Sequence, residues 1–172
     1  FDNEVIDLGF WPGGDRDGNP FVTTEITLRV AARLRNTIIK NYYRDMRDMR
    51  RRITFVGTVE ILADLERRLY DSIFLPGDKL KITKDELEEK LLAVRKIVVE
   101  QHQSLFLEEI DDLLNKIKMF GYHFATLDIR QDSRVHHHVM QEIVKECQKE
   151  GLAIFPDNYL ELSEEEQIKI LQ

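Results

Sequence analysis

Two arginines, Arg16 and Arg130, carry the side chains best suited to chemistry in this sequence. A guanidinium group stays charged at any pH that a protein tolerates, and its planar fork can hold a phosphate through two parallel hydrogen bonds. Arg130 ends a short apolar run that predicts a strand, and Arg16 lies in a loop rich in glycine and aspartate. If the strand belongs to a parallel barrel, Arg130 lies at the rim where such barrels build their active sites.

The loop around Arg16, residues 9–20, contains four glycines and two prolines. Its glycines permit positive φ angles, and Asp15, Asp17 and Asn19 are side chains that commonly close turns by bonding to the backbone. This composition predicts a tight, rigid loop that holds Arg16 in one place. A plain connector is the common alternative for such a segment.

Standard metal and nucleotide motifs do not fit these residues. The loop lacks the Gly-Lys-Ser/Thr triplet of a Walker A motif. An EF-hand would need Gly and Glu where the sequence has Pro20 and Ile26. Consecutive histidines at 136–138 point about 100° apart on a helix and cannot converge on one ion. Cys147 is the single cysteine, and we expect it to be a small buried apolar residue.

Two segments read as known motifs. Residues 10–23 are FWPGGDRDGNPFVT and residues 127–136 are LDIRQDSRVH, with Phe120 and Gly121 shortly before the second segment. They resemble the signature loop and the Asp-Ile-Arg-Gln motif of the phosphoenolpyruvate carboxylase family. Pro12 departs from a bulky apolar residue in the family pattern, and Asp132 departs from glutamate. Because both motifs occur in the correct order, the chain is identified as a bacterial-type member of this family.

The resemblance implies an activity and a role for Arg130. The family condenses phosphoenolpyruvate with bicarbonate, using Mg²⁺ or Mn²⁺, and releases oxaloacetate and phosphate through carboxyphosphate and the enolate of pyruvate. Its motif arginine binds the substrate phosphate, and this role carries over to Arg130. The structural alternative for Arg130 is an ion pair with Asp128 or Asp132 at the strand end.

The resemblance says less about the other motif residues. It links Arg16 to a phosphorylated sugar activator near a subunit contact, whereas an ion pair with Asp15 or Asp17 is the structural alternative. The residues that match the motifs without an assigned role are Asp15, Asp17, Asn19, Gln131 and His136.

Several parts that the family needs are absent from the sequence: the Thr-Ala-His-Pro motif of the catalytic histidine, the His-Gly-Arg-Gly-Gly loop and the metal-binding Glu and Asp. We therefore expect residues 1–172 to be one internal segment of a much longer protein, inactive by itself, with the metal ligands outside it. The parent is expected to be a cytoplasmic homotetramer.

Composition supports a soluble protein without nucleic-acid or membrane partners. The net charge of −7 and the pI of about 5.3 argue against a general nucleic-acid binder. A single cysteine suits a reducing cytoplasm, and no apolar run approaches the roughly 20 residues of a membrane span. One local exception is residues 29–52, whose net charge is +7. The alternative function is therefore a non-catalytic helical module that binds an anionic partner through this face; a solvated or subunit-facing helix is the simpler interpretation.

The elements that position the motifs follow from hydrophobic periodicity. We expect a strand and loop over 4–23, helices over about 24–119, and a strand followed by helices over 123–172. The helices are predicted at 24–52, at 55–74, from a capping box at Thr83, at 134–150 after a Ser133 cap, and from Ser163 onward. The pattern after Thr83 fits one long helix or two with a bend near 101–104.

These elements predict a mostly α fold with two short strands, near 5–11 and 123–129, the second of them buried. Two strands cannot close a barrel, so the helices must supply the core. In the parent, an α/β protein, the strands would belong to a larger (β/α)-type barrel.

Overall fold

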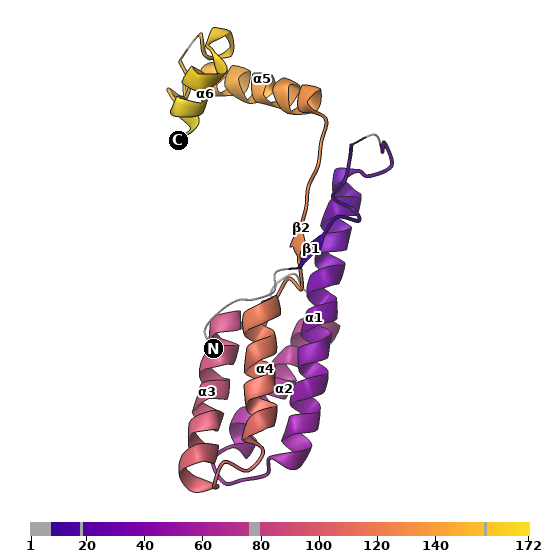
Figure 1. Cartoon of the computed structure of the whole chain (residues 1–172), viewed down its shortest axis with the longest axis vertical. Coiled ribbons are helices and arrows are strands. Elements are labelled where there is room, and N and C mark those ends of the chain that lie inside the picture. The colour runs from indigo at the N-terminus through magenta and orange to yellow at the C-terminus, as the bar shows by residue number, and fades with distance from the viewer. Residues whose placement is uncertain (1–7, 18, 76–79, 157) are drawn as a thin grey trace. The chain divides into compact units, whose positions relative to one another are not determined.

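The computed structural model describes residues 8–17, 19–75, 80–156 and 158–172. Helices dominate these residues, and the two strands pair in parallel, which confirms the predicted mostly α fold (Figure 1). The elements follow in the order β1 (Gly9–Phe10), α1 (Thr24–Arg52), α2 (Val59–Phe74), α3 (Lys84–Gln101), α4 (Leu107–Phe120), β2 (Thr126–Leu127), α5 (Ser133–Lys149), the 3₁₀ helix η1 (Tyr159–Glu161) and α6 (Glu164–Leu171).

The chain divides into two compact units. The first contains the described residues up to Gly14 together with Thr23–Asp128. The second contains Asp15–Val22 and Ile129–Gln172. The expectation that residues 1–172 are one internal segment of a longer protein stays a prediction.

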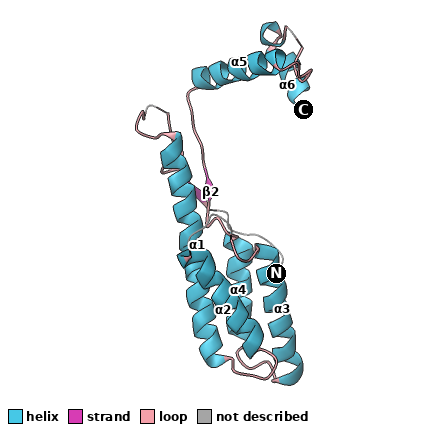
Figure 2. Cartoon of the chain, turned by 180° about the vertical axis from the view of Figure 1, so that it is seen from behind, coloured by secondary structure: helices cyan, strands magenta, loops and turns pink. Residues whose placement is uncertain are grey.

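The first unit is a four-helix bundle in which α1 packs on α2 and α4, and α3 packs on α2 and α4 (Figures 1 and 2). The apolar side chains that recur every three or four residues point inward and form one core. On α1 this row includes Ile38, Tyr42, Met46 and Met49, all buried. No helix in the described parts of the chain is long and apolar enough to cross a membrane.

The bounds of α1 and α2 follow from local backbone chemistry. Helix α1 has the predicted bounds, and the Thr23 hydroxyl accepts a hydrogen bond from the Ile26 amide at its start. Helix α2 begins at Val59, so the predicted start at residue 55 is wrong. The chain turns at Gly57, which has a φ of +84°, and Thr58 is the N-cap residue of the helix. Residues 75–78 are Leu-Pro-Gly-Asp, which is typical of a helix end; Leu75 caps α2 as this pattern predicts, and residues 76–78 lie outside the described residues.

The sequence pattern after Thr83 fitted either one long helix or two helices with a bend. The structure has two, α3 and α4. Thr83 caps α3 as predicted, accepting a hydrogen bond from the Glu86 amide. The chain then breaks at residues 102–106, where Gln103, Ser104 and Phe106 all have positive φ angles. Left-handed backbone cannot continue an α-helix, so the break is sharp.

Tyr42 ties α1 to the end of α4 within the bundle. Its buried hydroxyl donates to the Gly121 carbonyl at 2.7 Å and lies 3.2 Å from the Lys116 carbonyl. Burial raises the pKa of this hydroxyl well above its ordinary value, so it remains a donor. The contact closes the last turn of α4 directly before the chain turns towards β2.

Removing this hydroxyl should destabilise the bundle. We expect Tyr42→Phe to lower the free energy of unfolding by about 1–2 kcal/mol, because buried carbonyls lose their donor while the ring packing is retained. Urea denaturation of the chain measures the change. Tyr70→Phe is the matched control, since Tyr70 is 44% exposed. Equal stability of Tyr42→Phe and the control would contradict this interpretation.

The second unit contains α5, η1 and α6. Helix α5 begins at Ser133 with Asp132 as its cap, so the predicted Ser133 cap is wrong by one residue. A carboxylate accepts the first amides of a helix as well as a hydroxyl does and also complements its positive end. The predicted cap of the last helix is confirmed: Ser163 and Glu166 form a reciprocal capping box at the start of α6. Cys147 is half-buried, which is less than predicted.

Both strands are shorter than predicted. The prediction near 5–11 is confirmed at Gly9–Phe10, and residues 5–7 lie outside the described part. Strand β2 begins only at Thr126, because Phe124 takes a left-handed φ of +71°. The predicted burial of this strand is wrong, since Thr126 is exposed and Ile129 is 63% exposed.

Candidate anion-binding site

The two motif segments lie side by side because their strands pair. Gly9 is opposite Thr126 and Phe10 is opposite Leu127 in a parallel register. The Thr126 amide donates to the Leu8 carbonyl at 2.8 Å, and the Asp128 amide donates to the Phe10 carbonyl at 2.9 Å. Parallel pairing places the carboxyl ends of both strands, where the motifs continue, at the same edge.

In the second unit, the motifs meet again at Asp15 and Arg130. These two residues form an isolated parallel bridge, and the Arg16 amide donates to the Arg130 carbonyl at 2.9 Å. The backbone of the signature loop is therefore fixed directly against the backbone of the candidate arginine. Sequence reasoning singled out both segments but did not predict this pairing.

The double glycine of the signature loop is required by close packing in the first unit. Gly13 has a φ of +86°, and a Cβ atom there would lie 2.5 Å from a methyl carbon of Val30. A Cβ atom on Gly14 would lie 2.1 Å from the backbone carbonyl oxygen of Asp128. The Thr27 hydroxyl donates to the Gly13 carbonyl at 2.7 Å and fixes this turn to α1. Only residues without a side chain allow the two backbones to approach this closely.

The predicted turn-forming side chains behave as expected at two of the three positions. Asp15 accepts a hydrogen bond from the Asp17 amide at 3.2 Å, and Asn19 accepts one from the Phe21 amide at 3.1 Å. These are the short side-chain-to-backbone bonds that rigidify loops. Asp17 contributes its amide and is exposed.

Arg130 presents its guanidinium group to solvent. The side chain is 69% exposed, and its ion pair among the described residues is a long one, 4.0 Å from an Asp15 carboxylate oxygen. At this distance and exposure the pair contributes little stability, so an incoming anion can replace it at low cost. Asp15 was not one of the predicted partners of Arg130. Asp132, which was one of them, pairs with Arg134 at 2.6 Å.

Asp132 and Gln131 have structural contacts at the start of α5. The Asp132 carboxylate accepts the Arg134 amide at 2.8 Å and the Arg134 guanidinium at 2.6 Å. The side-chain and backbone hydrogen bonds from Arg134 lower the pKa of Asp132 to about 2. Gln131 accepts the Asp132 amide through its side-chain oxygen at 3.1 Å. Arg134 was not among the predicted site residues, because the predicted cap was Ser133 and not Asp132.

This contact predicts an acid-sensitive start of α5. The folded-state pKa of Asp132 lies below the unfolded value of about 3.9, so the stabilisation is fully present above pH 4. It should be lost as the pH falls through about 2. A carboxyl-carbon NMR titration of Asp132 is expected to give a midpoint near pH 2, and Arg134→Gln should raise that midpoint. A midpoint near 4 in the unmodified chain would contradict the contact.

The histidines at 136–138 lie exposed on α5, and His137 contacts Gln141 at 3.0 Å between side-chain nitrogens. Within the described ranges, no three His, Cys, Asp or Glu side chains lie close enough together to hold a metal ion. The described residues therefore do not fit the divalent metal that the family resemblance implies. The described surroundings of His136, which is exposed, do not indicate a chemical role for it.

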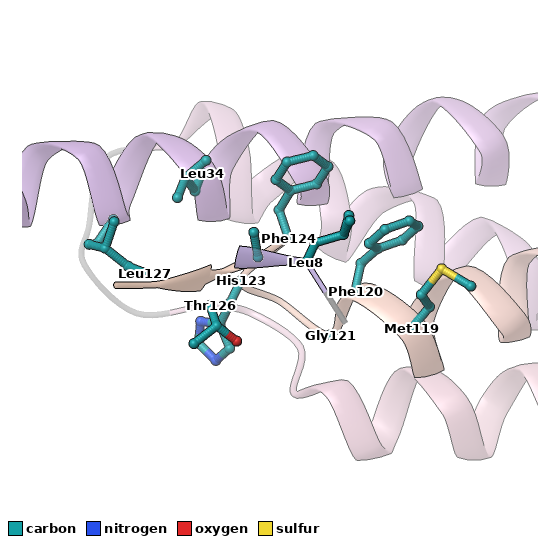
Figure 3. Close-up of a pocket in the computed structure, with 11 residues that line it drawn as sticks. Leu8, Leu34, Met119, Phe120, Gly121, His123, Phe124, Thr126 and Leu127 are labelled. Carbon is teal, nitrogen blue, oxygen red and sulfur yellow. The ribbon is translucent and has the colours of Figure 1, made fainter. Parts of the chain in front are cut away.

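An apolar hollow borders the paired strands in the first unit and was not predicted. It has a volume of about 420 Å³ and lies between α1, the strands and the end of α4 (Figure 3). Leu8, Leu34, Phe120, Phe124 and Leu127 line it. Leu8 is 38% exposed and Met119, at the rim, is 49% exposed, so the hollow leaves apolar surface open to water.

Comparison with known proteins identifies what the chain resembles. The family model described as phosphoenolpyruvate carboxylase matches residues 1–75 and 72–172. A phosphoenolpyruvate carboxylase of Shewanella loihica is 30% identical over 168 residues, which cover 81% of this chain and 19% of that protein. The chain thus spans about a fifth of the length of this curated relative.

Proposed function

Because the chain belongs to the phosphoenolpyruvate carboxylase family, we propose that its parent protein carboxylates phosphoenolpyruvate with bicarbonate and releases oxaloacetate and phosphate. The chain is then an internal segment that supplies part of the active site. The single observation that carries this proposal is the pairing of the two family motifs, which aligns Arg130 with the signature loop at Asp15.

Arg130 is the residue of this segment that would bind substrate. Its backbone is fixed by the Arg16 amide, while its guanidinium is exposed and only loosely paired. The backbone at Arg130 is therefore ordered before a phosphate binds, while the side chain can turn towards the phosphate without breaking a strong ion pair. A fixed positive charge beside the phosphate would stabilise its oxygens as charge moves during phosphoryl transfer to bicarbonate.

The remaining groups of the active site would come from the rest of the parent. The divalent metal, Mg²⁺ or Mn²⁺, would be held outside this segment, because the family resemblance places the metal-binding Glu and Asp in the part of the parent that follows it. The apolar hollow and the open edges of β1 and β2 would be covered when further strands complete a (β/α)-type barrel. The parent would assemble as a homotetramer in the cytoplasm.

Arg16 would serve regulation more than chemistry. Its amide supports Arg130, so the loop conformation and the substrate site are mechanically connected. We propose that its side chain contributes to the site of a phosphorylated sugar activator or to a subunit contact. The neighbouring motif residues Asp15 and Asn19 would maintain the loop through their turns.

The experiment compares the full-length parent with the isolated chain. In a coupled oxaloacetate assay with phosphoenolpyruvate, bicarbonate and Mg²⁺, we expect turnover from the parent and none from residues 1–172. Phosphoryl transfer needs a metal, a positioned nucleophile and an acid or base around the phosphate, and Arg130 supplies only a phosphate contact. An inactive, folded parent would overturn the proposed function. Turnover by the isolated chain above a protein-free control would overturn the assignment of the missing groups.

A further inference from the structure

One face of α1 carries a straight row of positive charges that the carboxylase site does not use. Its six side chains are exposed, and at about 100° per residue they fall within an arc of about 60°. At 1.5 Å per residue the row extends for about 33 Å. We call it the basic stripe; its members are Arg29, Arg33, Lys40, Arg44, Arg47 and Arg51.

The stripe is turned away from the bundle core. Buried Ile38, Tyr42 and Met49 lie on the opposite side of the helix, so packing fixes the stripe towards solvent. Of its six members, only Arg29 has an acidic partner within ion-pair distance among the described residues, Glu25 at 2.8 Å. Other cations of the same helix are already paired across the bundle, such as Arg52 with Glu109 at 2.7 Å.

Among the described residues, five positive charges of this row form no ion pair, and although Asp48 lies between Arg44 and Arg51 on the helix, the row as a whole repels itself in the free protein. A bound anionic partner would relieve this repulsion. The net charge of the chain is −7, so such a concentration of cations is local and not a consequence of composition.

The geometry of the stripe favours an acidic protein helix over a nucleic acid or a membrane. A helix in a DNA groove meets phosphates on both of its flanks, whereas the stripe is a single narrow row. Single strands need exposed aromatic rings for stacking, but Tyr43, the nearest ring, packs against Tyr70 at 5.8 Å and Phe74 at 6.2 Å. A membrane-surface helix needs a free apolar face, and that face of α1 lies in the core.

The spacing identifies the complementary pattern. The densest part of the stripe, Lys40, Arg44, Arg47 and Arg51, has positions i, i+4, i+7 and i+11. The separations between these positions, 4, 3 and 4 residues, are the same from either end of the helix. A partner helix with carboxylates at i, i+4, i+7 and i+11 therefore matches it in either direction; each of the three arginines can hold a carboxylate with two hydrogen bonds, and Lys40 can pair with the fourth.

We propose that the basic stripe of α1 is a docking surface for an acidic protein helix with this carboxylate spacing. The surface goes beyond the proposed carboxylase activity and lies on residues that the substrate site does not include. Docking there would be sensitive to salt, because every contact is an exposed ion pair.

The test uses the full-length protein and a synthetic helical peptide with glutamates at i, i+4, i+7 and i+11. The comparison peptide has the same composition with its glutamates spread around the helix. Fluorescence anisotropy at about 50 mM salt should show binding of the first peptide at least about tenfold tighter than the second. Triple reversal by Arg44→Glu, Arg47→Glu and Arg51→Glu should weaken it at least about tenfold.

The matched control reverses three exposed cations away from the stripe, Lys81→Glu, Lys96→Glu and Lys118→Glu, with the same change in net charge. It should bind like the unmodified protein. The milder Arg44→Gln, Arg47→Gln and Arg51→Gln variant replaces the triple reversal if that variant unfolds. The proposal would be overturned if both peptides bound equally well or if both sets of variants lost binding equally. It would also be overturned if duplex DNA or anionic vesicles bound more tightly than the first peptide. Carboxylase turnover, followed in parallel, separates this outcome from a failure of the proposed function.

Discussion

Replacing Arg130 with alanine in the full-length protein is expected to lower kcat/KM for phosphoenolpyruvate by about 30- to 1000-fold. Such a loss corresponds to about 2–4 kcal/mol of substrate or transition-state binding, the usual value of a charge-assisted contact to a reacting group. Among the residues that the structure describes, the exposed guanidinium has only a long ion pair with Asp15, so its removal should disturb the fold little. Steady-state kinetics across phosphoenolpyruvate concentration measure the effect, with folding checked by circular dichroism.

Three further variants sharpen this experiment. Arg130→Lys should recover only part of the activity, because an ammonium group keeps the charge but loses the planar fork. Arg134→Ala removes a guanidinium four residues away that pairs with Asp132, and it should leave kcat/KM within about threefold. Arg16→Ala should mainly change the response to a sugar phosphate or the association of subunits. An Arg130→Ala protein with kcat/KM within about threefold of the parent would make Arg130 a structural residue.

Substituting alanine for Gly14 is expected to destabilise the chain by about 3 kcal/mol. The new Cβ atom would lie 2.1 Å from the Asp128 carbonyl oxygen, and this contact is with backbone, which cannot rotate away. The strands would have to separate or the loop would have to shift, as in other overpacked sites. Urea denaturation gives the stability, and amide exchange at Asp128 reports whether its bond to the Phe10 carbonyl survives.

Gly9→Ala is the control for this prediction. A Cβ atom there meets only the end of the Asp128 side chain, at 3.2 Å, and Asp128 is exposed and free to change rotamer. We expect a loss of less than about 1 kcal/mol. Similar losses in both variants would show that the strand pair does not depend on the close approach at Gly14.

The amino-acid sequence alone determined the features that arise from neighbours along the chain. The apolar rows of α1, the caps at Thr23 and Thr83 and the box at Ser163 were readable because each depends on three or four adjacent residues. Residues 10–23 and 127–136 were enough to identify the family, since a motif keeps its residue types wherever the fold places it.

Local patterns failed where two local choices were close in energy. Apolar periodicity runs on through residues 102–106, so it did not show that α3 and α4 are separate helices. Asp132 and Ser133 are both good caps, and the ion pair of Asp132 with Arg134 accompanies the choice of Asp132. Strand β2 reads as apolar and buried, yet its apolar surface stays open in this segment.

Only the tertiary structure decided how the two motifs combine. Nothing in either segment states that Asp15 lies opposite Arg130, or that Gly14 must lack a side chain because the Asp128 carbonyl occupies that space. Both facts depend on the register of two strands that are far apart in the sequence. Backbone hydrogen bonds are available to almost every residue type and do not favour one register, and the hydrophobic pattern of strands with only two residues each is too short to specify one.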